Sequence, residues 1–137
     1  MTLDDATMAA LVAAARAARE RAYAPYSRFL VGAALLDEHG RIHAGCNIEN
    51  AAYPQGQCAE ATAIGHLVLA GGTRIVAAVV VGVAAEPVTP CGGCRQRLRE
   101  FAADDLPVWV ADMEAVRARF TLGQLLPASF GPAHLGP

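Results

Sequence analysis

Residues 74–83 read Arg-Ile-Val-Ala-Ala-Val-Val-Val-Gly-Val. Almost every residue in this stretch is β-branched or small and apolar, which is typical of a central strand buried on both faces. A helix is expected on either side of it in the chain. The upstream helix, 58–69, is closed by Gly71-Gly72, and the downstream helix, 91–101, follows a loop at 86–90. The stretch therefore predicts a sheet that is covered by helices.

Shorter patterns around this stretch complete the predicted architecture. Two apolar runs, at 31–36 and 42–47, flank a turn at 37–40 and predict a β-hairpin. Further elements are expected as a helix at 2–22, strands at 108–110 and 116–120, and a short helix at 121–126 with Thr121 at its N-cap. Because helices alternate with strands, we predict an α/β fold, a three-layer α/β/α sandwich with a mixed five-stranded sheet. We expect residues 1–137 to form a single domain.

Composition limits the classes of partner. The chain is 54% hydrophobic and 18% charged, with a formal net charge of -2 from 11 basic and 13 acidic residues. This balance argues against nucleic acid as a partner, because polynucleotide binders usually carry a basic footprint, but it does not exclude a neutral nucleoside. The longest apolar run, 75–85, is too short to cross a bilayer, so we expect no membrane association. The start lacks the basic residues of a signal peptide, and four cysteines suit a reducing compartment, so we predict a cytoplasmic protein.

Three cysteines carry the strongest chemical signal. They occur as Cys58-Ala59-Glu60 and Pro90-Cys91-Gly92-Gly93-Cys94, and each motif opens a predicted helix. Three thiolates can bind one Zn²⁺ and leave its fourth position open for water, whereas a structural site uses four protein ligands. Helix N-termini favour the thiolate form that zinc needs. We therefore predict a catalytic zinc site with ligands Cys58, Cys91 and Cys94.

Glu60 places a carboxylate beside the predicted zinc site. Three thiolates and Zn²⁺ sum to a charge of -1, so a bound water is less acidic there than beside neutral ligands, and a nearby base becomes more useful. Glu60 can accept a proton from the water and return it to a substrate nitrogen. This arrangement predicts hydrolytic attack on an electrophilic ring carbon, followed by loss of ammonia.

These motifs resemble the signature of zinc nucleoside deaminases, in which a Cys₃ site is joined by a glutamate that is not a ligand. The resemblance is to the small homotetrameric cytidine deaminases and continues from about residue 23 to the end of the chain. It rests on further segments: Tyr26-Ser27-Arg28-Phe29, Val31-Gly32-Ala33-Ala34-Leu35, Cys46-Asn47-Ile48-Glu49-Asn50-Ala51 and Leu125-Leu126-Pro127-Ala128-Ser129-Phe130-Gly131-Pro132. It implies conversion of cytidine or deoxycytidine to uridine or deoxyuridine and ammonia, in pyrimidine salvage.

The resemblance also implies roles for substrate-binding residues. Asn47 and Glu49 match a pair that binds the ribose 3′-hydroxyl, and an amide and a carboxylate can together donate to and accept from one hydroxyl. Phe29 matches an aromatic residue near the base. The backbones of Ala59 and Thr89 match contacts to the pyrimidine.

Two aromatic residues have matches at subunit contacts. Phe130 matches a residue contributed by a neighbouring subunit, and Tyr53 lies in the same inter-subunit region. These matches imply active sites shared between the chains of a homotetramer. The alternative for Phe29, Tyr53 and Phe130 is ordinary packing in the core or at an interface.

The chain departs from the family pattern at Leu30, where proline is frequent, and at Ala61, where many relatives have an arginine that hydrogen-bonds the thiolates. Some relatives instead place an arginine between the later cysteines, but here those positions are Gly92 and Gly93. Our hypothesis is that helix dipoles and backbone N–H groups offset the excess negative charge. Three arginines of helix 91–101 are expected on a solvated or inter-subunit face: Arg95, Arg97 and Arg99.

Alternative interpretations stay open. The cysteines could be buried structural thiols, or Cys91 and Cys94 a thioredoxin-like pair, which would leave Cys58 and Glu60 without a role. Cys46 is expected in the core, and the four histidines, which lack ligand spacing, on the surface. The same chemistry could act on a modified cytidine or another aminated heterocycle, including cytosine-like antibiotics, and the protein could also be a catalytically silent zinc- or nucleoside-binding protein. An enzyme that edits polynucleotides is disfavoured by the charge balance.

Overall fold

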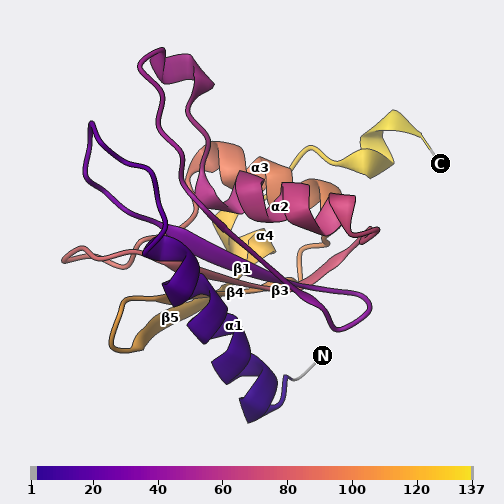
Figure 1. Cartoon of the computed structure of the whole chain (residues 1–137). Coiled ribbons are helices and arrows are strands. Elements are labelled where there is room, and N and C mark those ends of the chain that lie inside the picture. The colour runs from indigo at the N-terminus through magenta and orange to yellow at the C-terminus, as the bar shows by residue number, and fades with distance from the viewer. Residues whose placement is uncertain (1–2, 137) are drawn as a thin grey trace.

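The computed structural model describes residues 3–136 and contains one five-stranded sheet between helices (Figure 1). The strand order is β2-β1-β3-β4-β5, in which β3 and β4 are parallel and the other neighbouring pairs are antiparallel. The predicted mixed five-stranded sheet is therefore confirmed. In chain order the elements are α1 (Asp5–Arg19), β1 (Gly32–Asp37), β2 (Ile42–Cys46), η1 (Tyr53–Gln55), α2 (Ala59–Leu69), β3 (Ile75–Val81), α3 (Gly92–Phe101), β4 (Pro107–Ala111), β5 (Val116–Thr121), α4 (Leu122–Leu125) and η2 (Pro132–Leu135).

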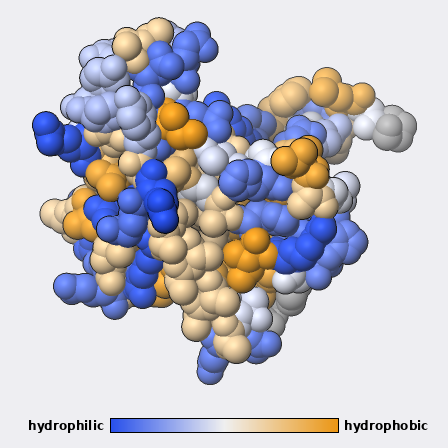
Figure 2. Space-filling view, viewed as in Figure 1, coloured by the Kyte–Doolittle hydropathy of each residue, from blue (hydrophilic) through white to orange (hydrophobic). Residues whose placement is uncertain are grey.

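The two faces of the sheet pack against different helices. Along β1, Ala33 and Leu35 join a core cluster with residues of α2, α3 and α4, whereas Ala34 and Leu36 join a cluster with α1. This alternation follows from the two-residue period of a strand. It confirms the three-layer arrangement. Figure 2 shows the outer face of α1 as a band of weakly hydrophobic side chains, which reflects its many exposed alanines.

Some elements are shorter in the structure than predicted, and two short helices were not predicted. The helix predicted at 2–22 spans Asp5–Arg19, because the Asp4 side chain accepts a hydrogen bond from Thr7 N and caps its start; residue 2 lies outside the described residues. Thr121 caps α4 as predicted, in a reciprocal capping box with Gln124. The short 3₁₀ helices η1 and η2 lie outside the helices and strands that the sequence predicts.

Close packing fixes the position of α2 over the sheet. A Cβ atom at Gly45 in β2 would lie 2.4 Å from Ala63 N and 2.6 Å from Ala59 O, so only glycine allows the helix backbone to approach this strand. This contact lies within one turn of the start of α2, where Cys58 and Glu60 are found. None of the helices within residues 3–136 has the length and apolar character needed to span a membrane.

Candidate metal centre and substrate cavity

The three predicted ligands meet where two helices begin. Cys58 is the N-cap residue of α2 and Cys91 is the N-cap residue of α3, and neither thiol forms a side-chain cap. Cys94 lies three residues after Cys91 and is buried. Both helices thus direct backbone N–H groups and the positive ends of their dipoles toward the same thiols.

The sulfur positions suit one tetrahedral zinc ion. Cys58 Sγ and Cys91 Sγ are 3.7 Å apart, and the sulfurs of Cys58, Cys91 and Cys94 all lie within 4.8 Å of one another. Zn–S bonds of about 2.3 Å at tetrahedral angles require sulfurs about 3.8 Å apart. Within residues 3–136, this trio is the only group of histidine, cysteine or acidic residues with such geometry, so Cys46 is not part of it. The set fits a zinc ion with one position left for a non-protein ligand.

Without a cation, two of the three thiols resist ionisation, because burial raises the pKa of Cys58 and of Cys94. At Cys91 burial is outweighed by hydrogen bonds, which lower the pKa. Burial raises the pKa of Cys94 far above that of a free thiol, and the negative charge of Glu60 adds to the effect. Because thiolates, not thiols, bind zinc, metal binding must displace these protons. The donor set therefore agrees with a bound metal ion, which would favour the thiolate forms of Cys58 and Cys94.

Glu60 lies in the first turn of α2 and is only 4% exposed. Burial raises its pKa, which brings the carboxyl group closer to the range in which it can exchange protons at neutral pH. The Glu60 side chain lines the same cavity as Cys58 and Cys91. The proton-accepting Glu60 and two of the three cysteines, Cys58 and Cys91, therefore line the same cavity.

This cavity has a volume of about 400 Å³, which is large enough for a nucleoside. Five of the predicted substrate-binding residues line it: Phe29, Asn47, Glu49, Ala59 and Thr89. The sequence did not single out five others: Ser27, Val31, Gln57, Val80 and Val88. Val80 belongs to the strand stretch 74–83, and its inward direction could have been inferred only from the strand register. The apolar valines give the cavity a wall without competing hydrogen bonds.

Asn47 and Glu49 already hold the loop that forms one side of the cavity. Asn47 accepts from Val31 N at 2.9 Å and donates to Phe29 O at 2.8 Å. Glu49 accepts from Tyr26 N and from both the amide and the hydroxyl of Ser27. These hydrogen bonds, led by that of the Ser27 hydroxyl, hold the pKa of Glu49 below its usual value. Glu49 is therefore ionised and positioned before any ligand arrives.

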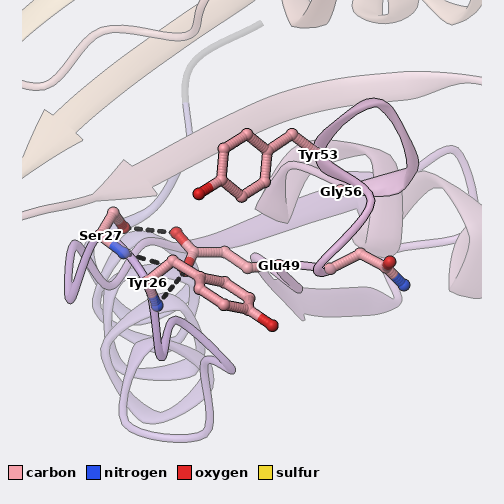
Figure 3. A pocket seen from close by; sticks show the side chains of 6 residues that line it. Tyr26, Ser27, Glu49, Tyr53 and Gly56 are labelled. Carbon is pink, nitrogen blue, oxygen red and sulfur yellow. Dashed lines mark hydrogen bonds between the residues drawn. The ribbon is translucent and has the colours of Figure 1, made fainter.

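A second cavity, drawn in Figure 3, shares Ser27 and Glu49 with the first. Tyr26 and Tyr53 line it, with ring centroids 5.9 Å apart in an edge-to-face arrangement. Tyr53 is 75% exposed and does not line the cavity beside the cysteines. Phe130, 57% exposed, stacks on His134 in the C-terminal segment and also lies away from that cavity. Their predicted substrate contacts are therefore not made within this chain.

Two of the arginines that were predicted on a solvated or inter-subunit face are partly buried and bonded to the protein. Arg95 donates to Pro90 O, Leu125 O and Thr89 Oγ1 at 2.7–3.1 Å and so ties the segment before Cys91 to α4. Arg99 donates to Ser129 Oγ and Ala102 O. The prediction of a solvated position is therefore wrong for both arginines. One acceptor of each, Leu125 O for Arg95 and Ser129 Oγ for Arg99, lies 30 residues further along the chain, which helical spacing does not reveal.

The fold and the site together define a metal-dependent hydrolase, in which a three-thiol centre and a buried carboxylate face a nucleoside-sized cavity. Residues 5–110 match the family model of the cytidine and deoxycytidylate deaminase zinc-binding region. The chain is 45% identical over 125 residues to a cytidine deaminase of Sporosarcina psychrophila, covering 91% of this chain and 92% of that protein. The chain belongs to the cytidine and deoxycytidylate deaminase family.

Solved structures agree with this assignment. The crystal structure of cytidine deaminase from Burkholderia pseudomallei superposes with a TM-score of 0.83 at 46% identity, covering 89% of this chain and 98% of that one. The crystal structure of cytidine deaminase from Mycobacterium tuberculosis gives a TM-score of 0.80 at 39% identity, covering 94% of this chain and 99% of that one. The family resemblance predicted from the sequence is therefore confirmed over most of the chain.

Proposed function

We propose that this protein is a zinc-dependent deaminase that converts cytidine and deoxycytidine to uridine and deoxyuridine with release of ammonia, in pyrimidine salvage. One observation carries the proposal. Three thiols have the spacing of a tetrahedral zinc site, and two of them, Cys58 and Cys91, line a single cavity of about 400 Å³ together with the buried Glu60. Family membership supports the same reaction.

The residues of the site would have separate roles in metal binding and proton transfer. Cys58, Cys91 and Cys94 would hold zinc, which supplies Lewis acidity for a water molecule when bound. Glu60 takes a proton from the attacking water and delivers it to the pyrimidine N3 while the C4–O bond forms. Glu60 then transfers the second water proton to the amino nitrogen, the C4–N bond breaks, and ammonia leaves.

Other residues would position the nucleoside. Asn47 and Glu49 would bind the ribose 3′-hydroxyl, Phe29 would pack near the base, and the backbones of Ala59 and Thr89 would contact the pyrimidine. Asn47 keeps one amide hydrogen and one lone pair beyond its two loop contacts, which supports a role in hydroxyl binding.

We further propose a cytoplasmic homotetramer with shared active sites. The exposure of Tyr53 and Phe130 on segments outside the cavity supports their burial against a neighbouring subunit, where each would complete a partner's site. Analytical ultracentrifugation tests the tetramer directly. A purely monomeric protein with full activity would contradict shared sites.

The test of the activity is a comparison of wild type with Glu60→Gln. This substitution keeps the shape of the side chain but removes the proton-accepting group. We expect kcat for cytidine to fall by about 10²–10⁴-fold, the usual range for a lost general acid–base group. Zinc content should stay at the wild-type value, because Glu60 lies outside the thiol cluster. A variant that deaminates cytidine at the wild-type rate would overturn the role of Glu60, and a zinc-loaded wild type that releases no ammonia would overturn the proposed function.

A further inference from the structure

The predicted zinc centre carries an excess of negative charge. Three thiolates and Zn²⁺ sum to -1, and the buried Glu60 carboxylate adds to this when it is ionised. The residue after Glu60 is Ala61, so the first turn of α2 offers no cationic side chain. Our sequence hypothesis assigns the compensation to helix dipoles and backbone N–H groups alone.

The structure shows one cationic side chain next to the thiols, in addition to the helix dipoles and backbone N–H groups. Arg97, on α3, points Nη1 at Cys94 Sγ at a distance of 3.7 Å. Of the three arginines of α3, Arg95 and Arg99 are committed to other acceptors. Arg97 takes part in no ion pair within residues 3–136, so its charge is available to the thiol cluster.

Small residues keep the space for Arg97 open. A Cβ atom at Gly93 would lie 3.2 Å from Arg97 Nη1, tighter than an ordinary van der Waals contact. Ala61 and Arg97 line the same groove between α2 and α3. A long side chain at position 61 would therefore compete with Arg97 for the space next to the thiols.

We propose that Arg97 is the positioning residue that offsets the excess negative charge of the three-thiolate zinc centre, and that Ala61 and Gly93 hold the space it occupies. This proposal rests on the zinc site of the proposed function. Three thiolates and Zn²⁺ form a centre of charge -1, so a nearby cation favours the metal-bound state. Because Arg97 is largely exposed, solvent screening keeps the expected effect moderate.

The test measures zinc affinity by competition with a chromogenic chelator at pH 7. We expect Arg97→Gln to weaken zinc binding about tenfold. Arg97→Lys should remain within about threefold of wild type, because it keeps the charge. Arg99→Gln is the matched control on the same helix and should leave affinity unchanged. Circular dichroism of each metal-free variant checks that the fold is intact.

A rescue experiment separates charge compensation from a structural role. Ala61→Arg in the Arg97→Gln background places a cation in the same groove from the opposite helix, and we expect it to restore most of the lost affinity. High salt should shrink the difference between Arg97→Gln and wild type. Wild-type affinity in Arg97→Gln, or an equal loss in Arg99→Gln, would overturn the proposal and leave the proposed function intact. A wild-type protein that binds no zinc would instead overturn the zinc site itself.

Discussion

Replacing Glu49 with glutamine tests how the sugar is recognised. Glu49 accepts hydrogen bonds from Tyr26 N at 2.9 Å, from Ser27 N at 3.1 Å and from the Ser27 hydroxyl. A carboxylate offers about four acceptor sites, so about one remains for a ligand. A hydrogen bond from a sugar hydroxyl to this charged group contributes about 1.5–3 kcal/mol, which corresponds to about 10–150-fold in kcat/KM.

The assay compares cytidine with 3′-deoxycytidine, and the measured quantity is the ratio of their kcat/KM values. Wild type should prefer cytidine by about 10–150-fold, and Glu49→Gln should reduce this preference to about threefold or less. The ratio is more informative than either rate, because the glutamine amide also faces the N–H groups of Tyr26 and Ser27 and disturbs the loop for both substrates. 2′-Deoxycytidine, which keeps the 3′-hydroxyl, should lose activity in parallel with cytidine.

Ser27→Ala provides the matched control. It removes one donor to Glu49 but keeps the carboxylate, so the preference for cytidine over 3′-deoxycytidine should persist even if both rates fall. Undiminished preference in Glu49→Gln would refute the role of Glu49, and a loss of preference in Ser27→Ala would assign the recognition to the loop instead.

Two further predictions concern the scaffold. The buried Asp37 carboxylate accepts hydrogen bonds from His39 N, Arg41 and His43, and these outweigh burial, which alone would raise its pKa, so that the pKa lies well below its usual value. Asp37→Ala should therefore lower the free energy of unfolding, measured by urea denaturation, by about 3 kcal/mol at pH 7. Because the folded-state pKa is depressed, the wild-type advantage should shrink progressively as the pH falls below about 4 and be lost only below the folded-state pKa. An advantage that does not decrease on acidification would contradict this. Gly45→Ala places a Cβ 2.4 Å from Ala63 N, so it should destabilise the fold by about 1–3 kcal/mol and weaken zinc binding. Gly65→Ala, which has open space around its Cβ, should be neutral or stabilising. Equal melting temperatures for the two variants would refute the packing argument.

Local patterns were enough to predict most of the fold. The strand at 74–83 and the two helices that begin with cysteines follow from residue type and spacing over about ten residues, and the structure places them within a few residues of the predicted bounds. The expectation that residues 1–137 form a single domain stays a prediction. The roles of the candidate site residues also stay predictions, although the cavity brings Phe29, Asn47 and Glu49 beside the cysteines.

Contacts between side chains could not be predicted from local sequence patterns. His43 was expected on the surface, yet its side chain is only 9% exposed and bonds to Asp37, because the hairpin turn folds it back over the carboxylate. Arg97 and Cys94 lie three residues apart on α3, so helical spacing permits their contact, but the sequence alone does not show which way the guanidinium points. The pairing of His43 with Asp37 requires the three-dimensional arrangement of two strands, which residue spacing along one strand does not contain.

The sheet topology explains why the two cysteine motifs meet. β2 and β3 both run antiparallel to β1, and β3 runs parallel to β4. α2 leaves the end of β2 and α3 leaves the end of β3, and both helices cover the same face, so their N-termini lie at the same edge of the sheet. In open α/β sheets this carboxyl edge is where ligands bind. The loops that line the rest of the cavity, 23–31 and 47–57, lie outside these helices, so substitutions there can alter sugar recognition while the arrangement of the three thiols is retained.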